Sequence, residues 1–242
     1  MRVNLPLLVS GLALLLAAGC RADEPIIATY HDRPPYLVQG VDGAPVGLTG
    51  TPAAHAFRQA GVAVTWLVAP TNRQLAMIKD PQQRSCAVGW FRNPERERFA
   101  RFTKPIYRDK EWVLLAYAGY TPPDDATLEQ LLQSPATRIL VKDNFSYGME
   151  IDAMIAHGKP AIAVTAGSQE QMLQSVSTGI VDFLFVSEEE GSYLVSRNGG
   201  RGASLRLLRP RGMPRGAERY IMCGKGVPES VIERLNKAIA FR

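Results

Sequence analysis

The chain has 242 residues, of which 46% are hydrophobic and 21% are charged. This balance is typical of a globular protein with its own core, and it excludes a disordered or fibrous chain. The formal net charge of +5 is a mild excess, and without a basic run interleaved with aromatic residues it does not favour nucleic-acid binding.

The N-terminus carries the pattern of an export signal. Residues 1–22 read MRVNLPLLVSGLALLLAAGCRA, with an apolar run that is too short to span a bilayer. Two cleavage sites compete. AAGC resembles a lipoprotein signal in which Cys20 becomes the acylated first residue, whereas cleavage after Ala22 leaves an unmodified protein. In both cases we expect a protein that acts outside the cytoplasm, either lipid-anchored through Cys20 or free.

The first part of the mature sequence alternates strands and helices. Apolar runs predict strands over residues 25–31, 62–69 and 85–91. Helical spacing of apolar residues predicts helices over residues 51–61 and 71–80. This order of elements predicts a mainly parallel sheet that is covered by helices.

A second unit of the same kind follows. Thr127 with Gln130, and Ser168 with Gln171, each form the sequence signature of a capping box that starts a helix. These helices alternate with apolar strands, which we predict over residues 112–120, 137–142, 161–166 and 181–187.

The chain ends on a strand over residues 219–226 and a helix that begins near Pro228. One strand and one helix cannot form a domain, so they must dock on an earlier unit. Cys86 and Cys223 are the two internal cysteines, and in an oxidising compartment they are candidates for a disulfide. If they pair, the end of the chain docks on the first unit.

The predicted layout is therefore an α/β protein of two lobes with a ligand cleft between them. We assign residues 23–111 and 213–242 to lobe 1, and residues 112–212 to lobe 2. The three histidines lack metal-ligand spacing, and we find neither a nucleophile elbow nor a phosphate-binding glycine loop. We expect no metal, no cofactor and no catalytic set.

Four segments resemble the bacterial periplasmic solute-binding proteins of the polar amino-acid type, family 3, which have the type II periplasmic-binding-protein fold. The most specific is NPERERFARFTKPIY, which is similar to the family pattern T-x-x-R-x-x-x-x-x-F-S-x-P-Y and places Arg96 on its ligand-binding arginine. The resemblance implies mixed, mainly parallel sheets with flanking helices. The other three segments are YHDRPPYLV with DGAPVGLTG, RILVKDNFSYG and GIVDFLFVSEEE.

The resemblance also implies a function. It indicates a periplasmic substrate-binding protein that captures a small anionic or zwitterionic solute, amino-acid-like or an organic acid, for an ABC-type importer. Two alternatives stay open: an enzyme on the same fold, similar to cyclohexadienyl dehydratases, and a ligand-sensing partner of a membrane receptor. We expect a monomer whose partners are the small molecule and either an ABC permease or a membrane sensor.

The charged binding residues of the family are only partly matched. Arg96 can offer a planar fork of donors to a carboxylate, and its alternative is a solvated surface arginine. Amino-acid binders hold the ligand ammonium with an Asp where this chain has Ser187. The next residue, Glu188, either replaces that Asp or only complements a helix dipole.

The aromatic candidates are Trp90, Phe91, Tyr30 and Tyr36, which lie beside the expected cleft loops. Each of them either contacts the ligand or packs in a core.

Asn144, Phe145 and Ser146 fall where a helix of the second lobe is expected to begin. Free backbone N–H groups at such a place favour an anion. The alternative is that Ser146 is only the N-cap of that helix.

Overall fold

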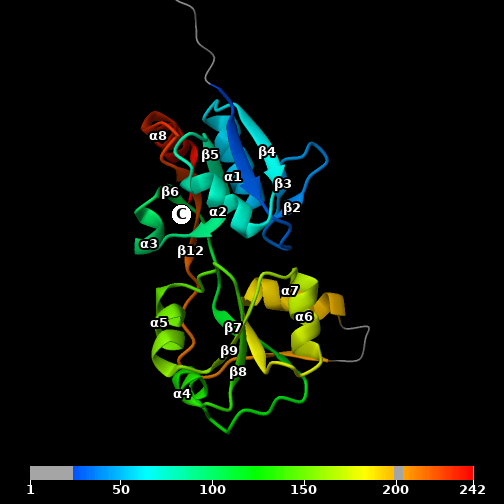
Figure 1. Cartoon of the computed structure of the whole chain (residues 1–242). Coiled ribbons are helices and arrows are strands. Elements are labelled where there is room, and N and C mark those ends of the chain that lie inside the picture. Colours follow the sequence, from blue (N-terminus) through cyan, green and yellow to red (C-terminus); the bar gives the residue numbers. More distant parts are fainter. Residues whose placement is uncertain (1–23, 199–203, 242) are drawn as a thin grey trace, which may run out of the picture.

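The computed structural model describes residues 24–198 and 204–241, which form two α/β lobes (Figure 1). The expected signal peptide and Cys20 lie outside the described residues. Within the described ranges, no helix is both long enough and apolar enough to cross a membrane.

The first lobe is built on a five-stranded sheet in the order β4-β1-β5-β12-β6. β1 runs parallel to β4 and β5, whereas β12 lies antiparallel between β5 and β6. The late strand β12 thus completes the sheet of the first lobe. The strands are β1 (Ile26–Tyr30), β4 (Val64–Val68), β5 (Ser85–Phe91), β6 (Ala100–Arg108) and β12 (Glu218–Gly224).

Helices cover both faces of this sheet. α1 (Gly50–Gln59) and α8 (Glu229–Ala238) bury Phe57 and Leu235 in one core cluster. α2 (Thr71–Lys79) buries Ile78 against Met222 in another. The apolar periodicity of each helix therefore faces the sheet, as expected for an α/β layer structure.

The predicted disulfide between Cys86 and Cys223 is present. The two cysteines lie directly opposite each other on β5 and β12, and 137 residues separate them in the sequence. Bridges across long loops commonly contribute about 2–4 kcal/mol to stability. This one fixes the returning end of the chain to the first lobe.

The second lobe has a five-stranded sheet in the order β11-β7-β10-β8-β9. β8 runs parallel to β9 and β10, whereas β7 lies antiparallel between β10 and β11. This mixed pairing is typical of large α/β sheets. The strands are β7 (Trp112–Tyr117), β8 (Arg138–Lys142), β9 (Ala161–Thr165), β10 (Phe183–Ser187) and β11 (Leu205–Leu208).

Two helices pack on each face of the second sheet. α4 (Leu128–Gln133) and α5 (Met149–Gly158) share one core cluster, and α6 (Gln169–Ser177) and α7 (Glu188–Asn198) share the other. Both predicted capping boxes are present at the starts of α4 and α6.

Several elements were not predicted from the sequence. β6 lies in the arginine-rich segment, and it tolerates Pro105 because it is the edge strand of its sheet. The others are short: β2 (Val38–Gln39) and β3 (Pro45–Val46) pair with each other, and α3 (Pro94–Glu97) has four residues.

Two segments connect the lobes, residues 109–111 and residues 209–217. They lie between β6 and β7 and between β11 and β12. The lobe limits that we assigned from the sequence stay a prediction.

Candidate functional site

A cavity of about 480 Å³ lies between the lobes. Its first-lobe wall follows the ends of β1 and β4, and its second-lobe wall includes the end of β8 and the start of α6. Ligand sites in open α/β sheets occur beyond the carboxyl ends of strands. The cavity is therefore where this fold is expected to hold a small molecule.

Much of the second-lobe wall is apolar. The ring of Phe145 and the side chains of Met172, Leu173 and Val186 line it. Polar groups stand among them, and they come from both lobes: Arg33, Asn72, Lys142, Gln169 and Glu190.

A separate gap of only about 30 Å³ lies beside Arg96. This space is much smaller than the cavity between the lobes. Trp90, Phe91, Phe145 and Ser146 are among the candidates that line it.

Arg96 is 6% exposed, and its guanidinium donates to two backbone carbonyls. Nη1 lies 2.8 Å from the oxygen of Phe91, and Nη2 lies 3.1 Å from the oxygen of Asn144, which belongs to the second lobe. The guanidinium also stacks 4.7 Å from the ring of Trp90. Burial lowers the pKa of Arg96 to about 10. A ligand role for Arg96 stays a prediction, and in this structure its fork joins the two lobes.

Arg33, which the sequence did not single out, makes a bidentate polar contact across the cleft. Its Nε and Nη2 donate to Oε1 and Oε2 of Glu190 at 2.8 and 2.7 Å. The guanidinium lies 5.2 Å from the centre of the Phe145 ring and 5.6 Å from that of Tyr36. The ion pair of Arg33 and Glu190 thus occupies part of the space between the lobes.

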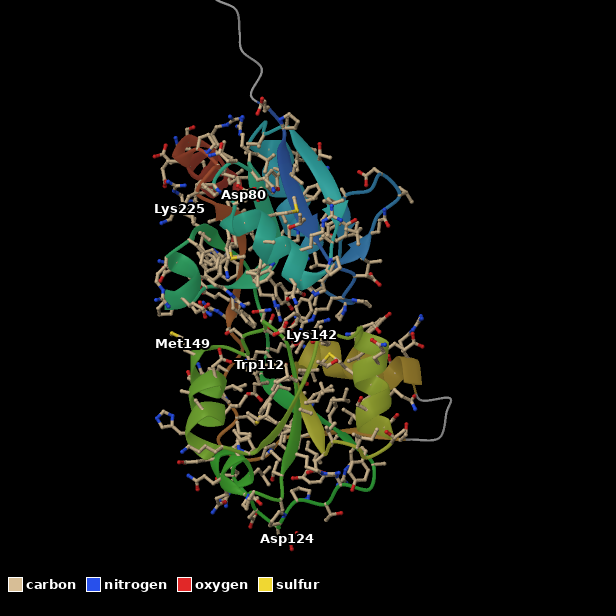
Figure 2. All side chains as sticks on the ribbon, in the orientation of Figure 1. Asp80, Trp112, Asp124, Lys142, Met149 and Lys225 are labelled. Atoms are coloured by element: carbon tan, nitrogen blue, oxygen red, sulfur yellow. A yellow bond between two sulfur atoms is a disulfide. The ribbon has the colours of Figure 1, made fainter. Side chains whose placement is uncertain are left out.

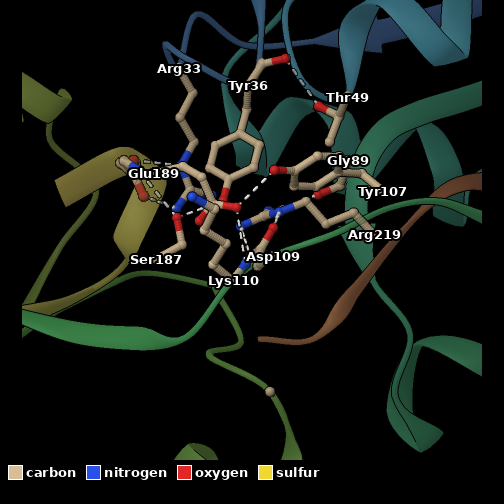
Figure 3. A network of polar contacts seen from close by, with 12 residues as sticks. Arg33, Tyr36, Thr49, Gly89, Tyr107, Asp109, Lys110, Ser187, Glu189 and Arg219 are labelled. Atoms are coloured by element: carbon tan, nitrogen blue, oxygen red, sulfur yellow. Dashed lines mark hydrogen bonds and ion pairs between the residues drawn. The ribbon is translucent and has the colours of Figure 1, made fainter. Parts of the chain in front are cut away.

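A polar network at the base of the cleft joins the lobes further (Figure 3). Tyr36 donates from its hydroxyl to Ser187 Oγ at 2.5 Å, and Tyr107 donates to Glu189 Oε1 at 2.7 Å. Burial is the main cause of the raised pKa of both tyrosine hydroxyls, which therefore stay protonated donors.

Arg219 anchors this network from β12. Its Nε and Nη2 each donate at 2.7 Å to the carboxylate of Asp109, and the two side chains are 3% and 0% exposed. Burial alone would lower the pKa of Arg219, but the Asp109 carboxylate outweighs it, and the pKa is raised. The pair sits where the chain leaves the first lobe, at the root of one connecting segment.

Four expected site residues line neither space: Tyr30, Tyr36, Asn144 and Glu188. Tyr30 is buried in the first-lobe core and donates to the carbonyl of Gly43. Glu188 pairs at 3.2 Å with Arg209 near the surface. Glu190, two residues further along α7, lines the cavity instead.

The expected helix start at Asn144, Phe145 and Ser146 is wrong. α5 begins at Met149, because Asn144 and Gly148 have positive φ angles of 58° and 88° that interrupt the helix. Asp152 accepts hydrogen bonds from the Tyr147 backbone N–H and the Ser146 hydroxyl. Ser146 is therefore not the N-cap, and a ligand role for these three residues stays a prediction.

His31 and Lys142 are further cavity residues that the sequence did not reveal. His31 also lines the gap beside Arg96. Burial, reinforced by the charges of Arg33, Lys142 and Arg219, lowers the pKa of His31 to about 3, so its ring is neutral at pH 7.

No family model matches the chain, and no curated protein matches it. Solved structures do. A histidine kinase sensor domain with similarity to periplasmic binding proteins is 19% identical, with a TM-score of 0.71 over 91% of this chain and 90% of that one. An ancestral arginine-binding protein bound to arginine is 16% identical, with a TM-score of 0.68 over 89% and 90%. The chain has the periplasmic-binding-protein fold.

Another similar structure is the amino acid ABC transporter substrate-binding protein AbpA from Streptococcus pneumoniae, bound to L-arginine. It is 16% identical, with a TM-score of 0.67 over 89% of this chain and 86% of that one. The α/β, two-lobed periplasmic-binding-protein fold predicted from the sequence is thus confirmed. At such low identities the likeness establishes the fold, and the function has to be argued from the cavity.

Proposed function

We propose that this protein is an exported, periplasmic substrate-binding protein that captures a small anionic or zwitterionic solute between its lobes for an ABC-type importer. The observation that carries the proposal is the cavity of about 480 Å³, to which both lobes contribute side chains. Pockets of roughly 300–1,000 Å³ are usual for small-molecule sites.

The connections between the lobes support capture by closure. Two short segments join them, so one lobe can rotate relative to the other with changes at few residues. A solute that contacts both walls of the cavity binds the closed state better than the open state. Such differential binding shifts the equilibrium toward closure.

Two cations without a carboxylate partner in the described part of the chain, Arg96 and Lys142, support an anionic group on the solute. The Arg96 fork is bonded to carbonyl groups, and Lys142 lies 5.3 Å from the Phe145 ring; in the described part of the chain, neither cation forms a salt bridge with a carboxylate. Both pKa values are lowered by burial, which means that each charge is incompletely compensated. An anion in the cleft would supply the missing compensation.

As a carrier, the protein binds its solute without converting it. A bound solute should therefore be recovered unchanged, which mass spectrometry of the released molecule would check. A thermal-shift screen of carboxylates, amino acids and aromatic acids identifies the class of solute. If only cations raise the melting temperature, the anionic part of the proposal is wrong.

A sensory role is the second candidate, and the bonds between the lobes favour it. The pair of Arg33 and Glu190 and the bond from Tyr36 to Ser187 hold the lobes together through the chain's own side chains. A closed state of this kind can present a fixed surface to a membrane receptor. Cellular uptake of the identified solute separates the candidates: deletion of the gene abolishes uptake for an importer subunit and leaves it unchanged for a sensor.

A further inference from the structure

We propose that the solute is a carboxylate with an apolar body, anchored by Lys142 and by the Nε2–H group of His31, with its body against the apolar wall of the cavity. This inference rests on the proposed function and names the chemical class of the solute. Lys142 ends β8 on the side of the second lobe that faces the first (Figure 2).

The hydrogen bonds of the first lobe determine which nitrogen of His31 carries the proton. The Trp90 indole can only donate, so Gln74 Oε1 is the acceptor of their 3.0 Å bond. Gln74 Nε2 then donates to the carbonyl of Ala69 and, at 3.3 Å, to Nδ1 of His31. Because Nδ1 accepts and the ring is neutral, the proton of His31 is on Nε2.

That Nε2–H donor is shielded from solvent and has no partner among the described residues. A buried donor without an acceptor costs free energy. His31 lines both the cavity and the small gap, so we infer that an oxygen atom of the solute that reaches this ring would satisfy the donor. An oxygen acceptor beside His31 would therefore be stabilised by a hydrogen bond from Nε2–H.

Lys142 offers a positive charge to the same group. Its ammonium lies 5.3 Å from the centre of the Phe145 ring, and the His31 ring packs against that ring at 5.9 Å. Burial lowers the pKa of Lys142, and the neighbouring charge of Arg33 lowers it further. A carboxylate beside Phe145 would reach both an ammonium and a neutral N–H donor, which together match its two oxygens.

Three acids line the cavity, and two of them, Glu190 and Asp143, are engaged by other side chains, whereas the exposed Asp32 forms no hydrogen bond or salt bridge within the described ranges. Glu190 accepts from Arg33 at both oxygens and, at Oε1, from Gln169 Nε2 at 2.9 Å. Asp143 Oδ2 accepts from the side-chain amides of Asn72 and Asn144. An ammonium that binds Glu190 or Asp143 would have to displace these bonds, whereas a simple carboxylate leaves them intact.

Phenylacetate and octanoate are suitable probes for calorimetry with the full mature protein. Acetate lacks the apolar body, 2-phenylethanol lacks the charge, 2-phenylethylamine reverses it, and arginine adds an ammonium. We expect phenylacetate and octanoate to bind more tightly than all four of these. Tighter binding of arginine or of the amine would overturn the inference and leave the proposed capture function standing.

Two variants test the anchor. Lys142→Gln should weaken phenylacetate binding about 10-fold to 100-fold, the range expected for a hydrogen bond to a charged group, and should leave 2-phenylethanol unchanged. His31→Phe, which keeps a ring and removes the donor, should weaken it by about 10-fold. Lys142→Arg keeps the charge and should retain most of the affinity.

Lys104→Gln is the matched control, because Lys104 is an exposed lysine of the first lobe outside both spaces. It should bind phenylacetate as the wild type does. Equal losses in Lys142→Gln and Lys104→Gln would reduce the effect to net charge and overturn the anchor. If no compound, arginine included, binds or alters the lobe arrangement, the proposed function itself fails.

Discussion

Arg33 and Glu190 form a bidentate ion pair that joins the two lobes across the cleft, with N–O distances of 2.8 and 2.7 Å. Their side chains are 14% and 4% exposed, so the pair is well shielded from water. Burial alone would lower the pKa of Arg33, but the Glu190 carboxylate outweighs it, and the pKa is raised. The pair therefore stabilises the closed arrangement.

Replacing one partner should open the cleft. Glu190→Gln leaves Arg33 as a shielded cation without a counter-charge, and separation of the lobes lets water solvate it. We expect a larger radius of gyration in small-angle scattering. The matched control is Glu188→Gln, which removes an acid that pairs with the exposed Arg209. An identical scattering curve for Glu190→Gln and wild type would refute a holding role for this pair.

The pair of Asp109 and Arg219 should instead affect global stability. Both side chains are almost fully buried at the root of a connecting segment, and Arg219 also stacks 4.2 Å from the Tyr36 ring. Asp109→Asn should lower the free energy of unfolding by about 3–5 kcal/mol, because it strands a buried cation. Chemical denaturation measures this change.

The neighbouring pair of Glu218 and Arg108 provides the control for that measurement. It is much more exposed, and surface pairs contribute about 0–1 kcal/mol. Glu218→Gln should therefore cost far less than Asp109→Asn. Similar losses in the two variants would show that burial of the Asp109 pair has no special effect.

His31 should make the closed state sensitive to acid. Burial lowers its pKa from 6.5 to about 3, and the facing cations Arg33, Lys142 and Arg219 reinforce the shift. Between these pH values an open or unfolded chain binds a proton that the closed chain does not. His31 therefore does not reduce the stability of the closed state above pH 6.5. Below that pH, its protonation in the open or unfolded chain lowers the closed-state stability by at most about 1.4 kcal/mol per pH unit.

The measurement is the unfolding free energy from pH 7 to pH 4 for wild type and His31→Gln. We expect a steeper loss in the wild type, and the difference between the two curves removes the contribution of the carboxylates. His157→Gln changes an exposed histidine and should follow the wild type. Parallel curves for wild type and His31→Gln would contradict the buried, neutral state of His31.

The variant Arg96→Ala tests whether Arg96 joins the lobes or binds the ligand. If its fork mainly joins the lobes, Arg96→Ala leaves two carbonyls without their donor and lowers the unfolding free energy by about 1–3 kcal/mol. Phenylacetate and 2-phenylethanol should then lose affinity by the same factor. Arg98→Ala, an exposed neighbour, should change neither quantity. A loss confined to carboxylates would instead show that Arg96 grips the ligand, as its sequence position predicted.

Regular periodicity explains why much of the fold could be predicted. β5 was predicted over residues 85–91 and spans Ser85–Phe91, because its apolar run is continuous and buried. The capping box at Thr127 is equally local, since side chain and backbone meet within one helical turn. β6 was missed because charged residues and Pro105 interrupt its apolar residues, and its pairing with the distant β12 decides its structure.

The cavity residues depend on contacts that no local pattern records. Arg33 and Glu190 are 157 positions apart, and each is unremarkable in its own segment. Lys142 was part of a predicted strand, where its direction toward the other lobe could not be read. One signal was available for Glu190: the three acids at the start of α7 leave room for one of them to turn inward, but only packing selects which.

The most direct test of the account is a scattering titration of Glu190→Gln with phenylacetate. This variant should begin with separated lobes, so closure around a solute produces its largest change. The account predicts that the radius of gyration falls to a plateau as phenylacetate is added. The midpoint of this fall should equal the dissociation constant that calorimetry measures on the same variant. A radius that stays constant while calorimetry shows saturation would mean that the solute binds without joining the lobes, and it would contradict the central claim of capture between them.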